Sequence, residues 1–327
     1  MRRLGCIAGV VVLTLLTAWA AAALYFDVRT SALRAPLAGL YVLVVLAAWT
    51  MGRHRRRAVL ATVGAFALVL AWWLSLRPSN DRDWQPDVAL LPFAEAQGDR
   101  VTVHHIRNCA YRTETDFDVR HYDRTFALDE LRTVDLFMVY WGSPHIAHTM
   151  VSFGFKDGTH LCFSIETRKE RGEEYSAVKG LFRQFELTYV VADERDLVRL
   201  RTNYRQGEDV YLFRLNATSA EARKFFLSYI RTMNDLAREP RWYNAATDNC
   251  TLGIRLQLAV SDRMPWDWRM LVNGHADALL YERHAISTPL PLAETKRRAL
   301  VNSRALAAGV GADFSQAIRE GLPGFEP

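Results

Sequence analysis

Three long apolar stretches open the chain before the pattern of hydrophobic and polar positions becomes mixed. They run from Leu4 to Phe26, from Leu37 to Gly52 and from Ala58 to Leu76. Each comes close to the ~20 residues that a helix needs to cross a bilayer, and the second is the shortest. The pattern predicts a membrane anchor of three transmembrane helices over residues 1–77. A cleaved signal peptide is the alternative for the first stretch, but no small-residue cleavage site ends it, so we favour an uncleaved anchor.

Short β-prone runs follow residues 78–99, which form a polar, proline-containing linker in this interpretation. A β-strand is predicted at each of the following: Val101–Ile106, Val134–Trp141, His145–Phe155, His160–Thr167, Leu181–Ala192, Val198–Tyr204 and Val210–Leu215. Asp157-Gly158, between the third and fourth runs, is a strong hairpin signal. In this hairpin we expect His148 to lie opposite residue 167 or 168. Glu166 shares a face with His148 only in the second register, or with a bulge.

Helix signals gather in the last third of the chain. Thr218 to Glu221 forms a capping box that opens a helix ending before Pro240. A second helix is expected to start near Cys250, after the N-cap residue types Thr247, Asp248 and Asn249. Further helices are predicted over Leu292–Ala308 and Phe314–Arg319. Residues 100–327 therefore read as one α+β domain with an antiparallel sheet packed against the Cys250 helix.

Arginine placement orients the predicted membrane helices. Arg2 and Arg3 precede the first, and a basic block of Arg53, Arg55, Arg56 and Arg57 separates the second from the third. The positive-inside rule then places the N-terminus and this block in the cytoplasm, and everything after Arg77 outside. Apart from those six arginines, 35 basic residues face 36 acidic ones, a balance of −1. The basic pI thus reflects topology, and no nucleic-acid partner is indicated.

Cys250 is the candidate nucleophile. A cysteine in the first turn of a helix lies near unpaired N–H groups and the positive end of the helix dipole, and both lower a thiol's pKa. A buried, inert cysteine is the alternative. The predicted outer domain contains Cys109, Cys162 and Cys250, an odd number, so at least one is free or pairs between chains. A Cys109–Cys162 disulfide is compatible with this count.

A thiol enzyme also needs a base and a group that orients the base. His148, on a predicted central strand, is the candidate base, and Glu166 is the candidate orienting group. Other histidines are weaker candidates: His104, His105, His121, His145 and His160. The alternatives are a hydrogen-bonded core histidine and an ordinary surface carboxylate. No set of residues has the spacing of a zinc site, and no cofactor is indicated.

Residues 107–126 are rich in Arg, Asp and Tyr. They form either a surface segment crossed by ion pairs or a surface that faces substrate. In the second interpretation, arginines would hold phosphate or carboxylate head groups. The candidate substrate-binding residues are Arg107, Arg112, Tyr122 and Arg124, with Asn249 beside the thiol.

The motifs RNCAYRTETDF, HYDRTFALDELRTVDLFMVYWG, AHTMVSFGFKDG, SIETRKERGEEYS, LFRQFELTYVVADERDLVRLRTNYR and YNAATDNCT together resemble the Lnb N-terminal periplasmic domain family. The resemblance covers roughly residues 100–260. That family is similar to circularly permuted papain-like thiol enzymes, including NlpC/P60-type relatives, in which histidine precedes cysteine. Its name comes from a bacterial lipoprotein N-acyltransferase. The resemblance implies His148, Glu166 and Cys250 as the equivalent positions.

Two functions follow as expectations. The first is a Cys–His enzyme of the bacterial inner membrane whose periplasmic domain forms an acyl-thioester. Backbone N–H groups at the start of the Cys250 helix would stabilise the oxyanion. The acyl group would pass to a lipoprotein or other lipid acceptor, or to water in a peptidase or amidase. The second is a non-catalytic module that binds lipid or peptidoglycan in the same cleft.

Overall fold

The computed structural model describes residues 2–51, 54–311 and 313–325, with the side chains of residues 2–6 left out. Arg53 and the side chains of Arg2 and Arg3, which entered the predicted orientation, therefore lie outside the described part. The chain divides into two compact units. The first unit contains residues 1–79, 175–186 and 242–244, and the second contains residues 80–174, 187–241 and 245–327.

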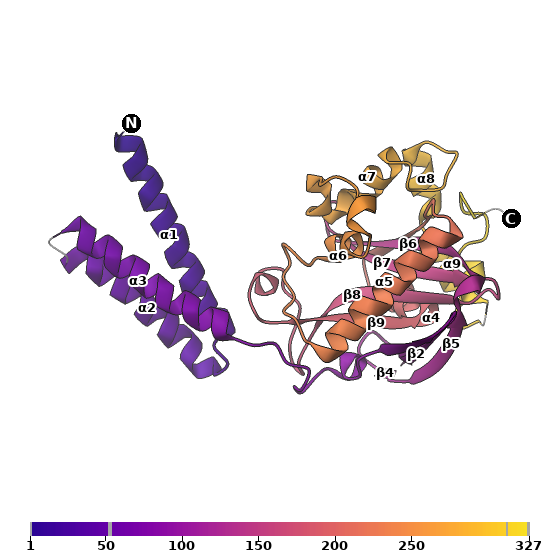
Figure 1. The fold of residues 1–327 in the computed structure, drawn as a ribbon, viewed down its shortest axis with the longest axis horizontal. Helices are drawn as coiled ribbons and strands as arrows, with labels where there is room; N and C mark the ends of the chain where they lie inside the picture. The colour runs from indigo at the N-terminus through magenta and orange to yellow at the C-terminus, as the bar shows by residue number, and fades with distance from the viewer. Residues whose placement is uncertain (1, 52–53, 312, 326–327) are drawn as a thin grey trace. The chain divides into compact units, whose positions relative to one another are not determined.

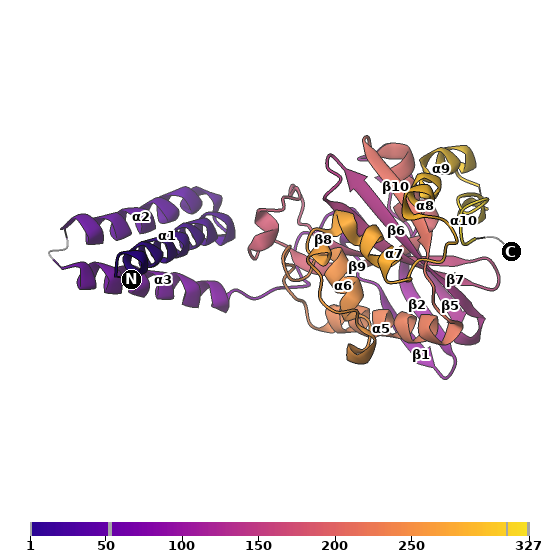
Figure 2. The ribbon, with the colours of Figure 1, turned by 90° about the horizontal axis from the view of Figure 1, so that it is seen from above.

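The first unit is built on helices α1 (Arg2–Asp27), α2 (Ser31–Met51) and α3 (Arg55–Ser75). Figures 1 and 2 both show them side by side. Among the described residues, three segments are long and apolar enough to cross a membrane: Ile7–Asp27, Ser31–Met51 and Arg55–Ser75. The three predicted apolar helices are thus confirmed. Helix α2 begins at Ser31, before the predicted Leu37, and includes Pro36.

Aromatic residues join the later segments of the first unit to its helices. Phe182 lies against Trp19 and Phe26, with ring centroids 6.5 and 5.0 Å apart. Asp27 accepts hydrogen bonds from Trp73 Nε1 at 2.7 Å and Gln184 Nε2 at 3.0 Å. Residues 175–186, expected to belong wholly to the outer domain, therefore pack within the unit that holds the apolar helices.

The second unit is organised around a sheet with the strand order β1-β2-β9-β8-β7-β6-β10, with β5 paired to β2. The strands are β1 (Phe93–Gln97), β2 (Arg100–Arg107), β5 (His121–Ala127), β6 (Leu131–Trp141), β7 (Ala147–Phe155), β8 (His160–Arg168), β9 (Glu186–Asp193) and β10 (Glu208–Arg214). Strand β2 pairs with β9 in parallel, so the sheet is mixed and the wholly antiparallel sheet was a wrong prediction. Strand β1 belongs to this sheet although it falls within the predicted linker.

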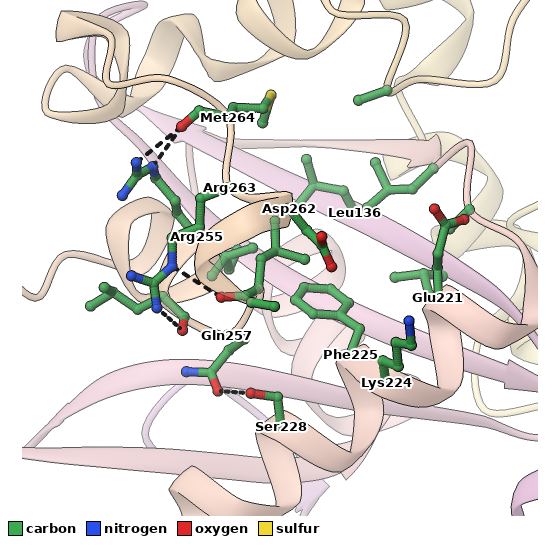
Figure 3. Close-up of a pocket in the computed structure, with 18 of the residues that line it drawn as sticks. Leu136, Glu221, Lys224, Phe225, Ser228, Arg255, Gln257, Asp262, Arg263 and Met264 are labelled. Atoms are coloured by element: carbon green, nitrogen blue, oxygen red, sulfur yellow. Dashed lines mark hydrogen bonds between the residues drawn. The ribbon is translucent and has the colours of Figure 1, made fainter.

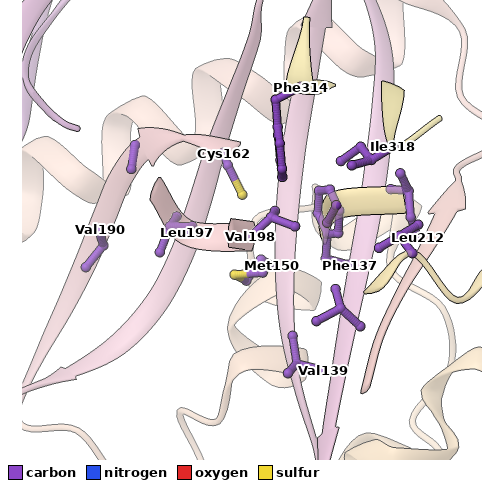
Figure 4. Packing of buried hydrophobic residues seen from close by; sticks show 14 of the residues in the cluster. Phe137, Val139, Met150, Cys162, Val190, Leu197, Val198, Leu212, Phe314 and Ile318 are labelled. Atoms are coloured by element: carbon purple, nitrogen blue, oxygen red, sulfur yellow. The ribbon is translucent and has the colours of Figure 1, made fainter. Parts of the chain in front are cut away.

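Two layers of helix cover the sheet. Helices α5 (Ser219–Arg238) and α6 (Cys250–Leu256) pack on one face, where α5 lies across the strands in Figure 1. The capping box of Thr218 and Glu221 at the start of α5 is confirmed. Helices α4 (Glu194–Arg199), α9 (Asn302–Ala308) and α10 (Phe314–Ala317) pack on the other face. Figure 4 shows the buried apolar side chains between the sheet and these helices, including Phe137 of β6, Met150 of β7 and Phe314 of α10.

Two predicted segments take another form, and some elements were not predicted. Residues 198–204 form the end of α4 and a π-helical turn, Leu200–Tyr204, so the strand predicted there was wrong. The predicted helix over Leu292–Ala308 is split into α8 (Leu292–Ala299) and α9, because Leu300 bridges to Tyr211 and Val301 N–H donates to Val210 O. Elements that were not predicted are β5, the two-residue strands β3 (Ala110–Tyr111) and β4 (Phe117–Asp118), and α7 (Ala276–Glu282).

Candidate active site

Cys250 is the first residue of α6 and is 7% exposed. Asn249 is the N-cap, and its side chain accepts a hydrogen bond from Leu252 N–H at 2.9 Å. The other end of the amide donates to Met270 O at 3.4 Å. The cysteine therefore occupies the predicted first helical turn. The side chain of Asn249, predicted to contact substrate, fixes where the helix begins.

The Cys250 thiol lies against the start of β7. Its Sγ atom accepts from Thr149 N–H at 3.3 Å and from Asn273 Nδ2 at 3.4 Å, and is 3.8 Å from Ala147 O. Two donors thus converge on the sulfur. Donors that point at a sulfur stabilise its thiolate form more than its thiol form.

His148 faces a carboxylate cluster through its Nε2 atom. Nε2 lies 2.7 Å from Ser164 Oγ and 3.1 Å from Glu166 Oε1. Ser164 Oγ donates to Glu166 Oε1 at 2.6 Å, and Arg201 Nη2 donates to the same oxygen at 3.1 Å. Since Nε2 is engaged by this cluster, Nδ1 is the nitrogen of His148 that remains available to the thiol.

The register of the hairpin explains why His148 and Glu166 meet. Met150 pairs with Ser164 and Gly154 with His160, so continuing the ladder brings His148 opposite Glu166. Both predicted registers, with residue 167 or 168 opposite His148, were therefore wrong. Side chains opposite one another in an antiparallel pair share a face, so no bulge is needed.

The histidine and the cysteine reach each other from opposite faces of the sheet. Successive side chains of a strand point to opposite faces of the sheet. Ile165, next to Ser164 on β8, lies against Gly253 of α6. Ser164 and His148 therefore point away from α6. Cys250 comes from the α6 side. The recorded β7–β8 pairing begins at Met150 and Ser164, one residue beyond Thr149, whose N–H bonds the sulfur. The two side chains thus meet at the end of this strand pair.

Electrostatics favour a thiolate–imidazolium pair. Burial raises the pKa of the Cys250 thiol, but hydrogen bonding and charge from His148, with help from Thr149, lower it to about 7. Burial lowers the pKa of His148, but the Glu166 carboxylate and the Cys250 hydrogen bond raise it to about 9. Burial likewise opposes ionisation of Glu166, whose pKa is nevertheless held well below its usual range by His148 and Arg201. Between pH 7 and 9 the proton therefore belongs on the histidine.

The other described cysteines differ from Cys250. Cys109, Cys162 and Cys250 are all buried and none forms a disulfide. Burial and the charge of Asp196 raise the pKa of Cys109 to about 12. Burial and the charge of Glu194 raise the pKa of Cys162 well above its ordinary value. Burial together with a nearby carboxylate therefore raises the pKa of Cys109 and Cys162, whereas the partners of Cys250 lower its pKa.

The other predicted substrate-binding residues are held by acidic side chains. Arg107 forms a bidentate pair with Asp196 at 3.0 and 2.7 Å. The remaining pairs are Arg112 with Asp116 and Asp118, Tyr122 with Asp193, and Arg124 with Asp157. Within the described residues, no hydrogen bond or ion pair joins Arg107, Arg112, Tyr122 or Arg124 to the Cys250 cluster. Their substrate-binding role remains a prediction.

Three residues of the cluster were missed by sequence reasoning. Ser164 carries a weak signal, because it lies two residues before Glu166 on the same face of a predicted strand. Arg201 gave none, since its segment was predicted as a strand. Asn273 gave none either, because it lies 23 positions beyond Cys250, in a stretch for which no element was predicted. Asn273 Oδ1 also accepts from Ala147 N–H at 3.1 Å, so this amide joins β7 to the thiol.

The alternative histidines lie elsewhere. His104 Nδ1 bonds Asp123 at 2.8 Å, and His145 Nδ1 bonds His275 Nε2 at 2.8 Å. His160 Nδ1 bonds Gly158 O at 3.0 Å. In the described part of the chain, no group of three or more His, Cys, Asp or Glu side chains is arranged to hold a metal ion.

Residues 118–274 match the model of the Lnb N-terminal periplasmic domain family. The match includes His148, Glu166, Cys250 and Asn273. No curated protein and no solved structure matches the chain. Three candidate membrane helices together with a periplasmic domain family indicate an inner-membrane protein.

Proposed function

We propose that this chain, whose residues 118–274 are an Lnb N-terminal periplasmic domain, is a thiol enzyme in which Cys250 forms an acyl-thioester. The observation that carries the proposal is the setting of the Cys250 thiol: Thr149 N–H and Asn273 Nδ2 donate to its sulfur, and His148, next to Thr149 in the chain, is paired with Glu166. The pKa of Cys250 is lowered to about 7, whereas that of Cys109 is raised to about 12. A thiolate near neutral pH is the reactive form of cysteine.

His148 acts as acid and then as base. The Cys250 thiolate attacks a carbonyl carbon, a C–S bond forms, and the bond to the leaving group breaks. The imidazolium of His148 gives its proton to the departing oxygen or nitrogen. An amine or water then attacks the thioester, His148 takes the proton from this nucleophile, and the released thiolate restores the starting state.

Glu166 and Ser164 orient the histidine. Both contact Nε2, which leaves Nδ1 for the sulfur, and the negative charge of Glu166 stabilises the imidazolium. Arg201 in turn holds Glu166 ionised. This division of roles resembles that in papain-like enzymes. The chain order of His148, Glu166 and Cys250 supports a circularly permuted relative of that group.

The proposal also covers the acceptor of the acyl group and the orientation of the chain in the membrane. The tether to apolar helices supports a lipid, lipoprotein or other envelope substrate, with acyl transfer to an amine or amide hydrolysis by water. The arginines before the first helix and those between the second and third helices support a cytoplasmic N-terminus and a periplasmic catalytic domain.

Trapping the thioester tests the proposal. Full-length protein is isolated rapidly from membranes, and a hydroxylamine-labile acyl adduct is sought at each cysteine by mass spectrometry. We expect an adduct on Cys250 that Cys250→Ser removes, while Cys162→Ala, a change at a high-pKa buried thiol, leaves it in place. An adduct that survives Cys250→Ser, or its absence from the wild type under single-turnover conditions with membrane lipid, would refute the proposal.

A further inference from the structure

A cavity of about 690 Å³ lies between α5 and the segment that contains α6. Figure 3 shows Phe225 and Leu136 pointing into it, with Lys224 and Glu221 on one side and Arg255 and Arg263 on the other. Pockets that bind small molecules typically measure about 300–1,000 Å³. The cavity is therefore large enough for a ligand, and no described residue fills it.

The walls of the cavity are mainly hydrocarbon. They come from several elements and include Leu136 of β6, Phe225 of α5, Ile254 of α6, Met270, and Leu279 of α7. Apolar surface that is not covered by protein favours an apolar occupant over water. The walls thus match a hydrocarbon chain better than a sugar or a peptide backbone.

Cationic side chains line the same cavity. Lys224, Arg231, Arg255 and Arg263 contribute four positive charges, against two negative charges from Glu221 and Asp262. Glu221 is engaged by the helix cap at Thr218, and Asp262 accepts from Ser261.

Within the described chain none of the four cations forms an ion pair. The guanidinium of Arg255 donates to Met264 O, and that of Arg263 donates to Leu258 O and Leu256 O. These bonds to neutral carbonyls fix the groups without neutralising them. The excess of positive charge favours an anionic head group.

The cavity comes within one residue of the Cys250 thiol along the chain. Thr149 and Thr251 line it, and they are the chain neighbours of His148 and Cys250. Thr149 also donates its N–H to Cys250 Sγ at 3.3 Å. A chain held in the cavity would therefore end one residue from the nucleophile.

The outer wall is apolar towards solvent as well. Val260, which lines the cavity, is 79% exposed, and Trp266 on the same segment is 62% exposed. Tryptophan is favoured at bilayer interfaces. Residues 76–79 alone separate α3 from the second unit along the chain, so this unit remains tethered to a bilayer rich in amphiphiles.

From these observations we infer that the cavity binds the hydrocarbon chain of a single-chain anionic amphiphile, with its carboxylate or phosphate at Lys224, Arg231, Arg255 and Arg263. The binding itself is independent of catalysis.

Photolabelling of the full-length Cys250→Ser variant tests the binding site. The protein is placed in phosphatidylcholine nanodiscs with a palmitate that carries a diazirine on its chain, and labelled peptides are mapped by mass spectrometry. We expect labels on α5 and α6, and at least a fivefold loss in Ser228→Phe, which fills the cavity. Ser219→Phe, the same change on the exposed start of α5, should label as before. Ala285→Phe fills the cavity from another wall and should repeat the loss.

Charge-removing substitutions test whether the cavity prefers an anionic head group. Lys224→Gln combined with Arg231→Gln should weaken labelling by photoreactive palmitate severalfold but spare the neutral photoreactive monoacylglycerol, whereas Arg238→Gln on the same helix should change neither. Inorganic phosphate at the concentration of the probe should not compete, because it lacks the chain. Equal labelling in Ser228→Phe and Ser219→Phe, or competition by phosphate alone, would overturn the inference. Cys250→Ser cannot form a thioester, so these labelling results do not depend on the proposed thiol chemistry. The trapping experiment tests that chemistry separately.

Discussion

Cys162 and Cys250 are both buried thiols in one domain, yet their pKa values shift in opposite directions. The difference comes from their neighbours. Cys250 has His148 and the Thr149 N–H, whereas Cys162 has the Glu194 carboxylate as its largest charged influence. The neighbours of the sulfur therefore distinguish Cys250 from Cys162, whereas the sequence around Cys250 indicates only that this residue begins a helix.

Glu166→Gln should weaken the thiolate without removing any side chain. The amide keeps the shape of Glu166 but loses the charge that holds the His148 pKa at about 9. With a less stable imidazolium, the pKa of Cys250 rises, and alkylation at pH 6.5 should slow about tenfold, the equivalent of roughly one pKa unit. Glu170→Gln, at a carboxylate that pairs with Arg82 instead, serves as the control. Equal alkylation rates in Glu166→Gln and wild type would remove Glu166 from the proposed mechanism.

At the scale of elements, α6 is held against the sheet by close contact. A Cβ atom added to Gly253 would lie 2.7 Å from Ile165 Cδ1, and the other atoms near it belong to the same side chain. The obstruction is the end of one flexible side chain on β8. The contact at Gly253 is thus one of packing, and an alanine there would force the Ile165 side chain to shift.

This contact predicts a coupled pair of substitutions. Gly253→Ala should lower the unfolding midpoint of the domain, and Ile165→Val should lower it too, because the removed Cδ1 leaves a small cavity. In the double variant the new methyl occupies the space of the missing one, so the losses should not add, with a coupling energy of about 1 kcal/mol. Thermal melts of the four proteins measure it. Additive losses would show that α6 does not pack on Ile165 as described.

Elements with strong local signals could be predicted from the sequence. Elements whose limits depend on pairing with a distant segment could not. The capping box at Thr218, the Asp157-Gly158 hairpin and the helix start at Cys250 each depend on neighbouring residues. The break at Leu300 depends on pairing with β10, about 90 residues earlier, and cannot be seen in a helical pattern.

The same distinction holds for the candidate site, where residues on elements with strong local signals could be predicted and the others could not. His148 and Cys250 lie on elements with clear signals, and the structure brings both together with Glu166. Asn273 lies in a stretch for which no element was predicted, and Arg201 lies in a π-helical turn whose residues were predicted as a strand. Only the folded chain brings these two residues to the site.

For the whole molecule, the proposed orientation can be tested with introduced cysteines. His54 lies between α2 and α3, and Ala220 is exposed on α5. In spheroplasts that carry these changes on the Cys250→Ser background, a membrane-impermeant maleimide should label Ala220→Cys directly and His54→Cys only after lysis, because the arginine block favours the cytoplasm. Labelling of both sites, or of His54→Cys alone, before lysis would contradict the orientation.

The most direct measurement is the rate of iodoacetamide alkylation at each cysteine of the full-length protein between pH 5 and 9. The thiolate reacts, so the rate at Cys250 should rise with pH through a midpoint at about 7, while Cys109, whose pKa is about 12, stays slow throughout. In His148→Ala the burial of Cys250 is no longer offset, so its midpoint should move to 9 or above and its rate at pH 7 should fall roughly fiftyfold. His104→Ala, at an exposed ion pair, should leave the profile unchanged. A Cys250 that reacts no faster than Cys109, or a profile that is indifferent to His148→Ala, would contradict the Cys250–His148 pair.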